Sequence, residues 1–232
     1  MADIRVSICT PSSGIVHAAY AMGLPGMLLH YFQTPVMGQK ETDNREALLQ
    51  IQLGANIGAN RDAMVDEAIK VEATHVLFID DDMGFLPETL NVMLARQLPV
   101  LLCNYRRKIP PGLFTATNKD NTASIQTTPE STSCVEAYFG GFGFALIETQ
   151  VFKALKKPRF LMYYTEELGY TTEDRPFFDA VHKAGFPVFV DQDASKMVWH
   201  NGTFNYCYDQ VLPPEWDTPT PMRLLRNMKV NG

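Results

Sequence analysis

An uninterrupted apolar strand that ends in three carboxylates is the feature that most constrains this chain. Residues 76–79 read Val-Leu-Phe-Ile and are followed at once by Asp80, Asp81 and Asp82. An apolar run without polar alternation predicts a strand that is covered on both faces, as in a parallel sheet. Ligands of open α/β sheets bind beyond the carboxyl ends of the strands, so we expect the three charges where such a fold places its chemistry.

Three neighbouring carboxylates repel one another unless a partner offsets their charge. A divalent cation is the natural partner, because hard cations prefer carboxylate oxygens. A solvated acidic loop is the alternative, and the apolar strand directly before the triplet makes it less favourable. The sequence therefore favours a metal-linked role for residues 80–82.

The composition is that of one large α/β domain. The chain has 232 residues, of which 46% are hydrophobic and 20% are charged, so it can bury a sizeable core. A net charge of -6 argues against a strongly basic footprint for nucleic acid. Two local basic stretches, residues 106–108 and 153–159, either face a phosphate or form solvated surface.

Cysteine usage and the lack of long apolar runs favour a cytoplasmic protein. The four cysteines are far apart and form no CxxC pair, which argues against a cysteine-based zinc site. No apolar run approaches the roughly 20 residues that cross a bilayer, and the N-terminus lacks the apolar core of a signal peptide. We therefore expect a reducing compartment and no membrane span.

Alternating strand and helix patterns predict a largely parallel sheet in the first half of the chain. Strands are expected over 4–9, 76–79 and 99–103, and helices over 60–73 and after Pro87. Asn60 is the expected N-cap of the helix that it opens. The apolar stretch 22–37 is interrupted by Gly and Pro, and we interpret it as a short helix followed by a strand around 28–32.

The second half of the chain has a different character. Residues 118–133 are rich in Thr, Ser and Asn, which predicts a mobile loop or an edge hairpin. Beyond them the pattern predicts, in order, strands over 134–139 and 144–147, a helix over 149–156, a polar loop over 163–172, a helix over 175–184 and a strand over 186–190. One domain is expected over residues 1–210, followed by a Pro-rich C-terminal tail over 211–232.

Four motifs in this order resemble a glycosyltransferase of the GT-A fold, in its small, soluble, bacterial or phage-type form. The first is Thr10-Pro11-Ser12 after the first strand, and the second is a helix with Asn60-Arg61-Asp62 that leads into the acidic triplet within 78–83, with its Asp-x-Asp pattern. The third is Thr172-Glu173-Asp174, which opens a helix, and the fourth is the late segment over 198–202 that contains His200. The resemblance covers roughly residues 4–204. It implies a Rossmann-like, mostly parallel central sheet flanked by helices, with a smaller antiparallel strand pair. It also implies a nucleotide-sugar donor, a UDP-sugar being favoured, and Mn²⁺ or Mg²⁺ as cofactor.

The resemblance assigns the metal to the triplet and to the late histidine. It makes Asp82 the direct metal ligand and lets Asp80 contact the ribose, or the metal through water. His200 is the expected third ligand, although a histidine is often a structural hydrogen-bonding group. A cation at this position would neutralise the charge that grows on the departing diphosphate.

Donor binding is expected from several further residues. In doubly wound sheets, the loop after the first strand usually contacts the base and ribose of a bound nucleotide. The alternative for this loop is a plain turn that binds no ligand. Arg61 could reach the base or a phosphate, or be a surface arginine. The full set of expected donor contacts is Thr10, Pro11, Ser12, Arg61, Asp80, Asp81 and Gly141.

Glu173 and Asp174 are the expected catalytic pair, with Asp174 favoured for the cleft. In an inverting enzyme such a carboxylate takes the proton of the acceptor hydroxyl, whereas in a retaining enzyme it orients the acceptor. The alternative is a helix N-cap that complements the helix dipole. By analogy with enzymes that carry a late histidine we expect retention, with inversion through Asp174 as the alternative.

A transferase is the leading interpretation, and two others remain open. One is a metal-dependent carbohydrate-binding protein without catalysis. The other is a sugar-nucleotide pyrophosphorylase, which needs a basic residue in the loop after the first strand, where this chain has Thr-Pro-Ser-Ser-Gly. The hydroxyl acceptor is a glycan, a small molecule or a modified nucleic-acid base, and a homo-oligomer is among the assemblies that the sequence leaves open.

Overall fold

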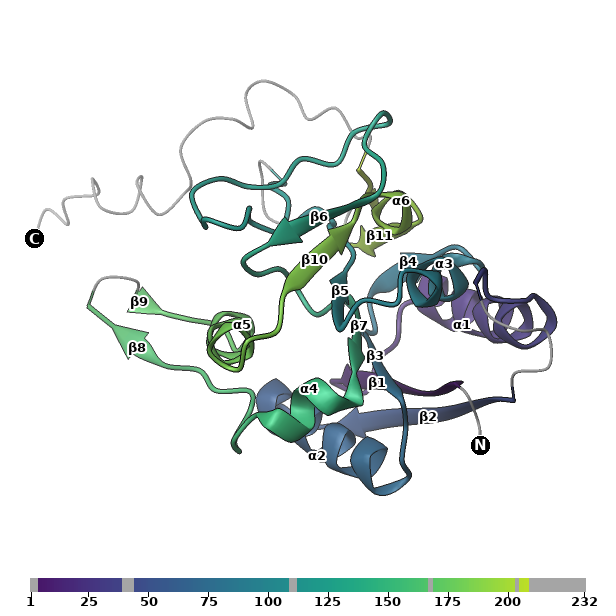
Figure 1. Cartoon of the computed structure of the whole chain (residues 1–232), viewed down its shortest axis with the longest axis horizontal. Helices are drawn as coiled ribbons and strands as arrows, with labels where there is room; N and C mark the ends of the chain where they lie inside the picture. Colours follow the sequence, from purple (N-terminus) through teal and green to yellow (C-terminus); the bar gives the residue numbers. More distant parts are fainter. Residues whose placement is uncertain (1–3, 39–43, 109–111, 167–168, 203–204, 209–232) are drawn as a thin grey trace, which may run out of the picture.

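A seven-stranded sheet forms the centre of the protein (Figure 1). The computed structural model describes residues 4–38, 44–108, 112–166, 169–202 and 205–208. The strand order is β2 (Arg45–Leu53), β1 (Ile4–Ser12), β3 (His75–Ile79), β7 (Phe144–Glu148), β5 (Val100–Leu102), β10 (Val188–Asp191) and β6 (Cys134–Ala137). Strands β7 and β6 run against the other five, so the sheet is mostly parallel, as the sequence predicts.

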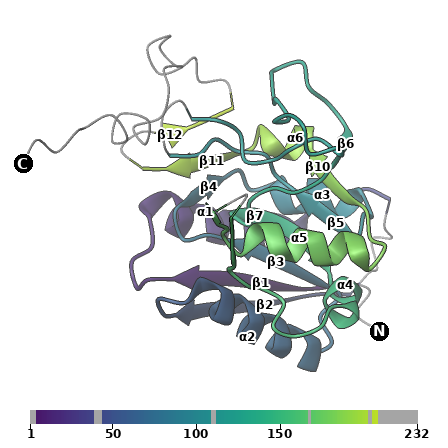
Figure 2. The same cartoon turned by 90° about the vertical axis from the view of Figure 1, so that its left-hand side faces the viewer.

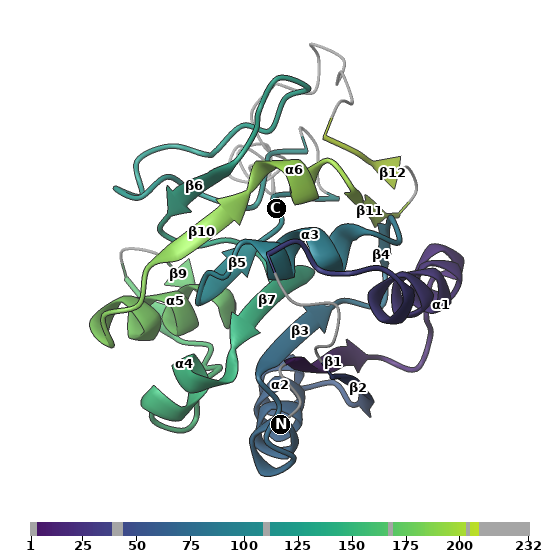
Figure 3. The same cartoon turned by 45° about the vertical axis from the view of Figure 1, so that its right-hand side comes forward.

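Helices cover both faces of the sheet. Along β3, alternate side chains enter two separate hydrophobic clusters, Val76 and Phe78 on one face and Leu77 and Ile79 on the other. The first face packs against α2 (Ile57–Lys70), α4 (Thr149–Ala154) and α5 (Asp174–Lys183), as Figure 2 shows. The second packs against α1 (Ala18–Gln33), α3 (Thr89–Ala95) and α6 (Gln192–Ser195), and α1 and α3 lie side by side (Figure 3).

Two smaller antiparallel sheets complete the fold. One joins β4 (Met83–Phe85) to β11 (Val198–Asn201) and β12 (Asn205–Tyr206), and the other pairs β8 (Tyr164–Thr165) with β9 (Gly169–Tyr170). The predicted smaller antiparallel element is therefore present. In the pairing of β11 with β4, His200 lies opposite Met83, the residue that directly follows the acidic triplet.

Two predictions for the first half are wrong. Residues 28–32 are not a strand but part of α1, which continues through Pro25 and buries Tyr20, Met27 and Tyr31 on one face. Helix α2 begins at Ile57 rather than Asn60, and its cap is Asn56, whose side chain accepts from the Ala59 N–H at 3.1 Å. The actual second strand, β2, has a half-exposed and irregular burial pattern that the sequence did not reveal.

The second half follows the predicted order with shifted ends. Helix α5 begins one residue earlier than expected and ends at Lys183, before Gly185 with its φ of +85°. The predicted loop over 163–172 contains the β8–β9 pair, and no named strand lies within 118–133. The Pro-rich tail over 211–232 lies outside the described residues. None of the described helices combines the length and the apolar character that crossing a bilayer requires.

An aromatic cluster fixes α5 against the sheet. The ring of Phe177 on α5 stacks on Phe160 with centroids 4.9 Å apart and contacts Phe142 at 5.0 Å and Phe152 at 5.7 Å. All four side chains are buried. Large buried rings carry much of a core's stabilisation, so this cluster holds the helix that begins at Asp174.

Replacing Phe177 with Ala is expected to destabilise the fold by about 3–5 kcal/mol, because the cavity left by a buried ring closes only in part. Urea unfolding followed by far-UV circular dichroism measures the loss. Leu113→Ala removes a side chain that is 53% exposed and serves as the control, with little expected change. A similar midpoint for both variants would show that α5 does not depend on the cluster.

Candidate active site

The acidic triplet forms a fixed turn at the carboxyl end of β3. The Asp80 N–H donates to the Gly143 carbonyl at 3.0 Å, and the Met83 N–H donates to the Asp80 carbonyl at 3.1 Å. The Asp82 carbonyl accepts from both the backbone N–H and the side-chain amide of Asn201, each at 2.9 Å. Main-chain bonds thus hold the turn in place without using the carboxylates.

A buried arginine joins the triplet to the start of α5. The guanidinium of Arg61 donates to Asp80 Oδ1 at 2.8 Å and also forms an ion pair with Glu173. Its side chain is almost fully buried and lies 4.8 Å from the ring centroid of Phe142 and 5.7 Å from that of Phe78. It borders neither of the two cavities described below. Arg61 therefore connects two acidic segments, the turn after β3 and the start of α5.

Burial shifts the two carboxyls near this arginine toward their neutral forms. Burial raises the pKa of Asp80, and the Arg61 charge opposes the shift. Burial likewise raises the pKa of Asp174 to about 7, and Arg61 again acts in the opposite direction. A carboxyl that titrates near neutrality can both accept and release a proton under ordinary conditions.

Asp82 has the opposite electrostatic setting. Burial raises its pKa, but His200 and Lys108 outweigh that effect and lower it to about 2. Lys108 forms an ion pair with Asp82 Oδ2. The carboxylate of Asp82 is therefore charged throughout the physiological range.

The Asp82–His200 pair has the donor chemistry of a cation site. His200 Nδ1 lies 3.2 Å from the Arg106 carbonyl, which assigns the proton to Nδ1 when the ring is neutral and leaves a lone pair on Nε2. That Nε2 lies 3.3 Å from Asp82 Oδ1, a buried oxygen that accepts no hydrogen bond from the residues that the structure describes. Two acceptors that face each other in this way fit a shared cation.

The described part of the chain supplies only this pair. Within it, no group of three or more His, Cys, Asp or Glu side chains is arranged to hold a metal ion. Asp80, predicted as a further ligand, is bound to Arg61. A cation at Asp82 and His200 would take its remaining ligands from a bound molecule or from water.

Two cavities meet at the Asp82 side chain. The first has a volume of about 280 Å³ and is lined by Pro11, Ser12, Ser13, Gly54, Ala55, Ile57, Asn60, Asp80, Asp81 and Asp82. The second, of about 390 Å³, is lined by Tyr105, Arg107, Lys108, Thr115, Phe139, Gly140, Gly141, Thr172, Asp174 and His200. Because Lys108 and His200 both reach Asp82, these three side chains lie where the cavities adjoin.

The predicted donor residues divide between cavities and core. Pro11 and Ser12 line the first cavity, together with Asp80 and Asp81. Thr10 is buried, and its hydroxyl lies 2.6 Å from that of Tyr20.

Gly141 lines the second cavity rather than the first. A Cβ at this position would lie 2.3 Å from the Tyr105 hydroxyl. Glycine is therefore required here by the packing of that tyrosine, whatever its role toward a ligand.

Several lining residues escaped sequence analysis. Tyr105 is buried, and its hydroxyl accepts from the Gly143 N–H at 2.8 Å, which shapes the glycine turn. Asn60 lines the first cavity instead of capping α2. Arg107 and Lys108 line the second, and they belong to the basic stretch over 106–108 for which the sequence left a phosphate contact and a solvated surface open.

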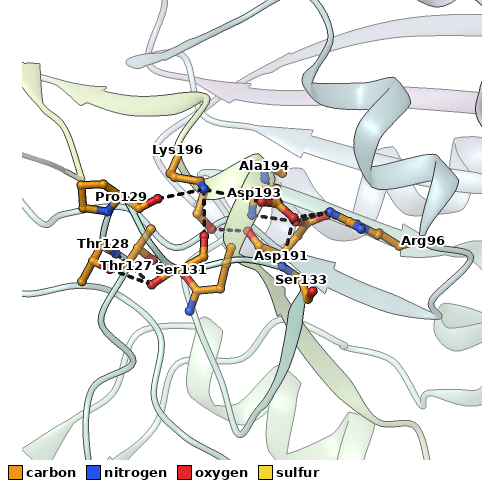
Figure 4. A network of polar contacts seen from close by, with 12 residues as sticks. Arg96, Thr127, Thr128, Pro129, Ser131, Ser133, Asp191, Asp193, Ala194 and Lys196 are labelled. Atoms are coloured by element: carbon orange, nitrogen blue, oxygen red, sulfur yellow. Dashed lines mark hydrogen bonds and ion pairs between the residues drawn. The ribbon is translucent and has the colours of Figure 1, made fainter.

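A polar network away from both cavities positions α6, the helix that precedes β11 (Figure 4). Arg96 donates to Asp191 at 2.8 Å and to Asp193 at 2.7 Å, and Asp191 caps α6 by accepting from two of its N–H groups. Lys196 donates to the Ser131 carbonyl at 2.8 Å. The network ties the polar segment over 118–133 to α6 and thereby to the strand that carries His200.

Comparisons with known proteins agree with this architecture. No family model matches the chain, and no curated protein matches its sequence. The solved structure of A197 from STIV superposes with a TM-score of 0.57 at 15% identity, over 90% of this chain and 97% of that one. GalNAc-T7, solved with UDP, GalNAc and Mn²⁺, gives a TM-score of 0.53 at 10% identity, over 89% of this chain and 45% of its own.

A third solved structure, S. aureus TarS 1-349 with UDP-GlcNAc, is 16% identical over 90% of this chain and 62% of its own. Its TM-score is 0.45, which is too low to establish a shared fold. At these identities the likeness establishes the fold alone. The chain has the GT-A fold, as the resemblance of its motifs implies. It spans less than half the length of the GalNAc-T7 chain.

The raised pKa of Asp174 predicts a pH-dependent stability. Between its ordinary value of 3.8 and about 7, the folded state holds a proton that the unfolded state releases, so stability falls as the pH rises through this window. Asp174→Asn cannot titrate. The melting temperature of the variant minus that of the wild type should therefore increase between about pH 5 and about pH 8. Differential scanning fluorimetry measures this difference. Asp120→Asn, at an exposed position, is the control, and parallel curves for Asp174→Asn and the wild type would contradict the shift.

Proposed function

We propose that this protein is a glycosyltransferase that moves a sugar from a nucleotide-sugar donor, in particular a UDP-sugar, to a hydroxyl acceptor. The observation that carries the proposal is the Asp82–His200 pair at the junction of two cavities, with the Asp174 carboxyl lining the second. The GT-A fold supports it, as does the fact that the similarly folded GalNAc-T7 was solved with UDP, GalNAc and Mn²⁺.

The first cavity is the proposed nucleotide site. Pro11 and Ser12 are not in the turn after the first strand that the sequence predicts, but are the last two residues of β1, at the sheet edge where α/β folds bind ligands. Asp82 and His200 would hold Mn²⁺ or Mg²⁺ against the diphosphate of the donor. Such a cation, when bound, neutralises charge on the leaving group. Asp80 and Asp81 complete the acidic border of this cavity.

Asp174 is the proposed general base for the acceptor. It lines the second cavity, and a pKa of about 7 leaves a substantial carboxylate fraction at neutral pH. The carboxylate takes the proton of the acceptor hydroxyl while that oxygen bonds to the anomeric carbon. The bond from the anomeric carbon to the diphosphate breaks, and its electron pair leaves with the phosphate. The ion pair between Glu173 and Arg61 fixes the start of α5, where Asp174 lies.

This arrangement supports inversion rather than the retention expected by analogy. Retention without an enzymic nucleophile needs no base from the protein, whereas an in-line displacement needs one on the acceptor side. Asp174 is a candidate for that base because it lines a different cavity from the proposed nucleotide site. The acceptor itself is a hydroxyl compound, with glycan, small molecule and modified base as the proposed classes.

Asp82→Asn is expected to weaken Mn²⁺-dependent binding of UDP by about tenfold or more, because an amide replaces a charged ligand. Isothermal titration of UDP with and without Mn²⁺ measures the effect, and Asp120→Asn is the matched control at an exposed position. Equal affinities for the wild type and Asp82→Asn would remove the triplet from the nucleotide site. A wild type that binds no nucleotide would favour a carbohydrate-binding protein.

Asp174→Asn is expected to lower turnover by about 10²–10⁴-fold while leaving UDP affinity intact, since the lost group acts on the acceptor. Wild-type turnover should rise with pH through about 7, as the Asp174 carboxyl loses its proton. The anomeric proton coupling of the product, read by NMR, should show inversion relative to the donor. A product of retained configuration would exclude Asp174 as the base of an in-line displacement.

A further inference from the structure

Lys108 holds a position between the two cavities that the proposed chemistry does not yet use. It lines the second cavity, and its ammonium pairs with Asp82, which lines the first. The side chains of Lys108 and Asp82 are each 32% exposed. The ion pair is therefore partly exposed and joins the lining of one cavity to that of the other.

The two cations of the acidic turn differ in their freedom to move. Arg61 is buried beside two aromatic rings and bonded to two carboxylates, so its charge cannot leave Asp80 without rearranging the core. Among the described residues Lys108 forms one ion pair, and it has a flexible four-carbon stem in a partly exposed site. Of these two charges, Lys108 is the exchangeable one.

A divalent cation and the Lys108 ammonium compete for the same carboxylate. Asp82 Oδ2 is occupied by Lys108, while Oδ1 faces His200 Nε2 without a hydrogen bond. A doubly charged ion seated between Oδ1 and Nε2 would repel an ammonium on the neighbouring oxygen of the same group. The ammonium must then find another anion, and the diphosphate of a bound nucleotide is the anion that the proposed reaction brings to this junction.

We propose that Lys108 is an exchangeable counter-ion, which pairs with Asp82 in the free protein and transfers to the donor diphosphate when a divalent cation takes over Asp82. The proposal deepens the glycosyltransferase function and rests on it. Lys108 thereby opposes metal binding before the nucleotide arrives and supports nucleotide binding afterwards. This makes the cation and the nucleotide bind cooperatively, because each relieves the cost that the lysine imposes on the other.

Lys108→Met tests both halves of the proposal with opposite signs. In the absence of nucleotide, Mn²⁺ should bind the variant about three- to fivefold more tightly than the wild type, the size expected of a partly exposed ion pair. Electron paramagnetic resonance of free Mn²⁺ measures this without any turnover. At saturating Mn²⁺, UDP should bind the variant about tenfold more weakly, because a charged phosphate contact is lost.

Two variants serve as controls. Lys119→Met removes an exposed lysine that is paired with Glu136, and should change neither affinity. Lys108→Arg keeps the positive charge and should retain the weak Mn²⁺ binding of the wild type. Tighter Mn²⁺ binding in Lys108→Arg as well would show that the effect comes from geometry and not from charge, and would overturn the competition.

The remaining outcomes separate this proposal from the proposed function. Unchanged or weaker Mn²⁺ binding in Lys108→Met overturns the competition even when UDP binds the wild type normally. Tighter Mn²⁺ binding together with unchanged UDP affinity overturns the transfer to the diphosphate. A wild type that binds Mn²⁺ but no nucleotide overturns the transfer and the glycosyltransferase function together, while the Mn²⁺ comparison still decides the competition.

Discussion

The buried guanidinium of Arg61 is the interaction on which the site depends. It bonds to Asp80 after β3 and to Glu173 before α5, two segments that the sequence separates by more than ninety residues. A charge buried this deeply is tolerable only because acidic partners accompany it, and removing both would leave it uncompensated. The same contact links the acidic turn after β3 to the start of α5, where Asp174 lies.

The acidic triplet shows how one turn can give identical residues opposite properties. Burial biases Asp80 toward its neutral form, whereas His200 and Lys108 keep Asp82 charged. Pairs of titratable groups with divergent settings are a common sign of a chemical site. The fixed charge of Arg61 therefore stabilises the turn at Asp80, whereas the exchangeable charge of Lys108 at Asp82 is the one proposed to take part in ligand binding.

Local patterns were sufficient for the parts of the fold that depend on local chemistry. The apolar run of β3 and the start of α5 could be predicted because strand burial and helix entry leave direct traces in the sequence. Helix α1 was misjudged because Pro25 interrupts its pattern, and β2 was missed because an edge strand is only half buried. The burial of Arg61 could not be predicted, since arginine is usually exposed and its partners are distant in sequence.

The pairing of β11 with β4 has a consequence for how the site tolerates change. His200 lies opposite Met83 on a single rung of this ladder, so the backbone, rather than side-chain packing, sets its distance from Asp82. Neighbouring residues on a strand point to opposite faces, and a shift of one position would present Trp199 or Asn201 in place of the imidazole. Insertions or deletions of a single residue in β11 are thus excluded by geometry, whereas the long segment over 112–133 lies outside this ladder and is free of that restriction.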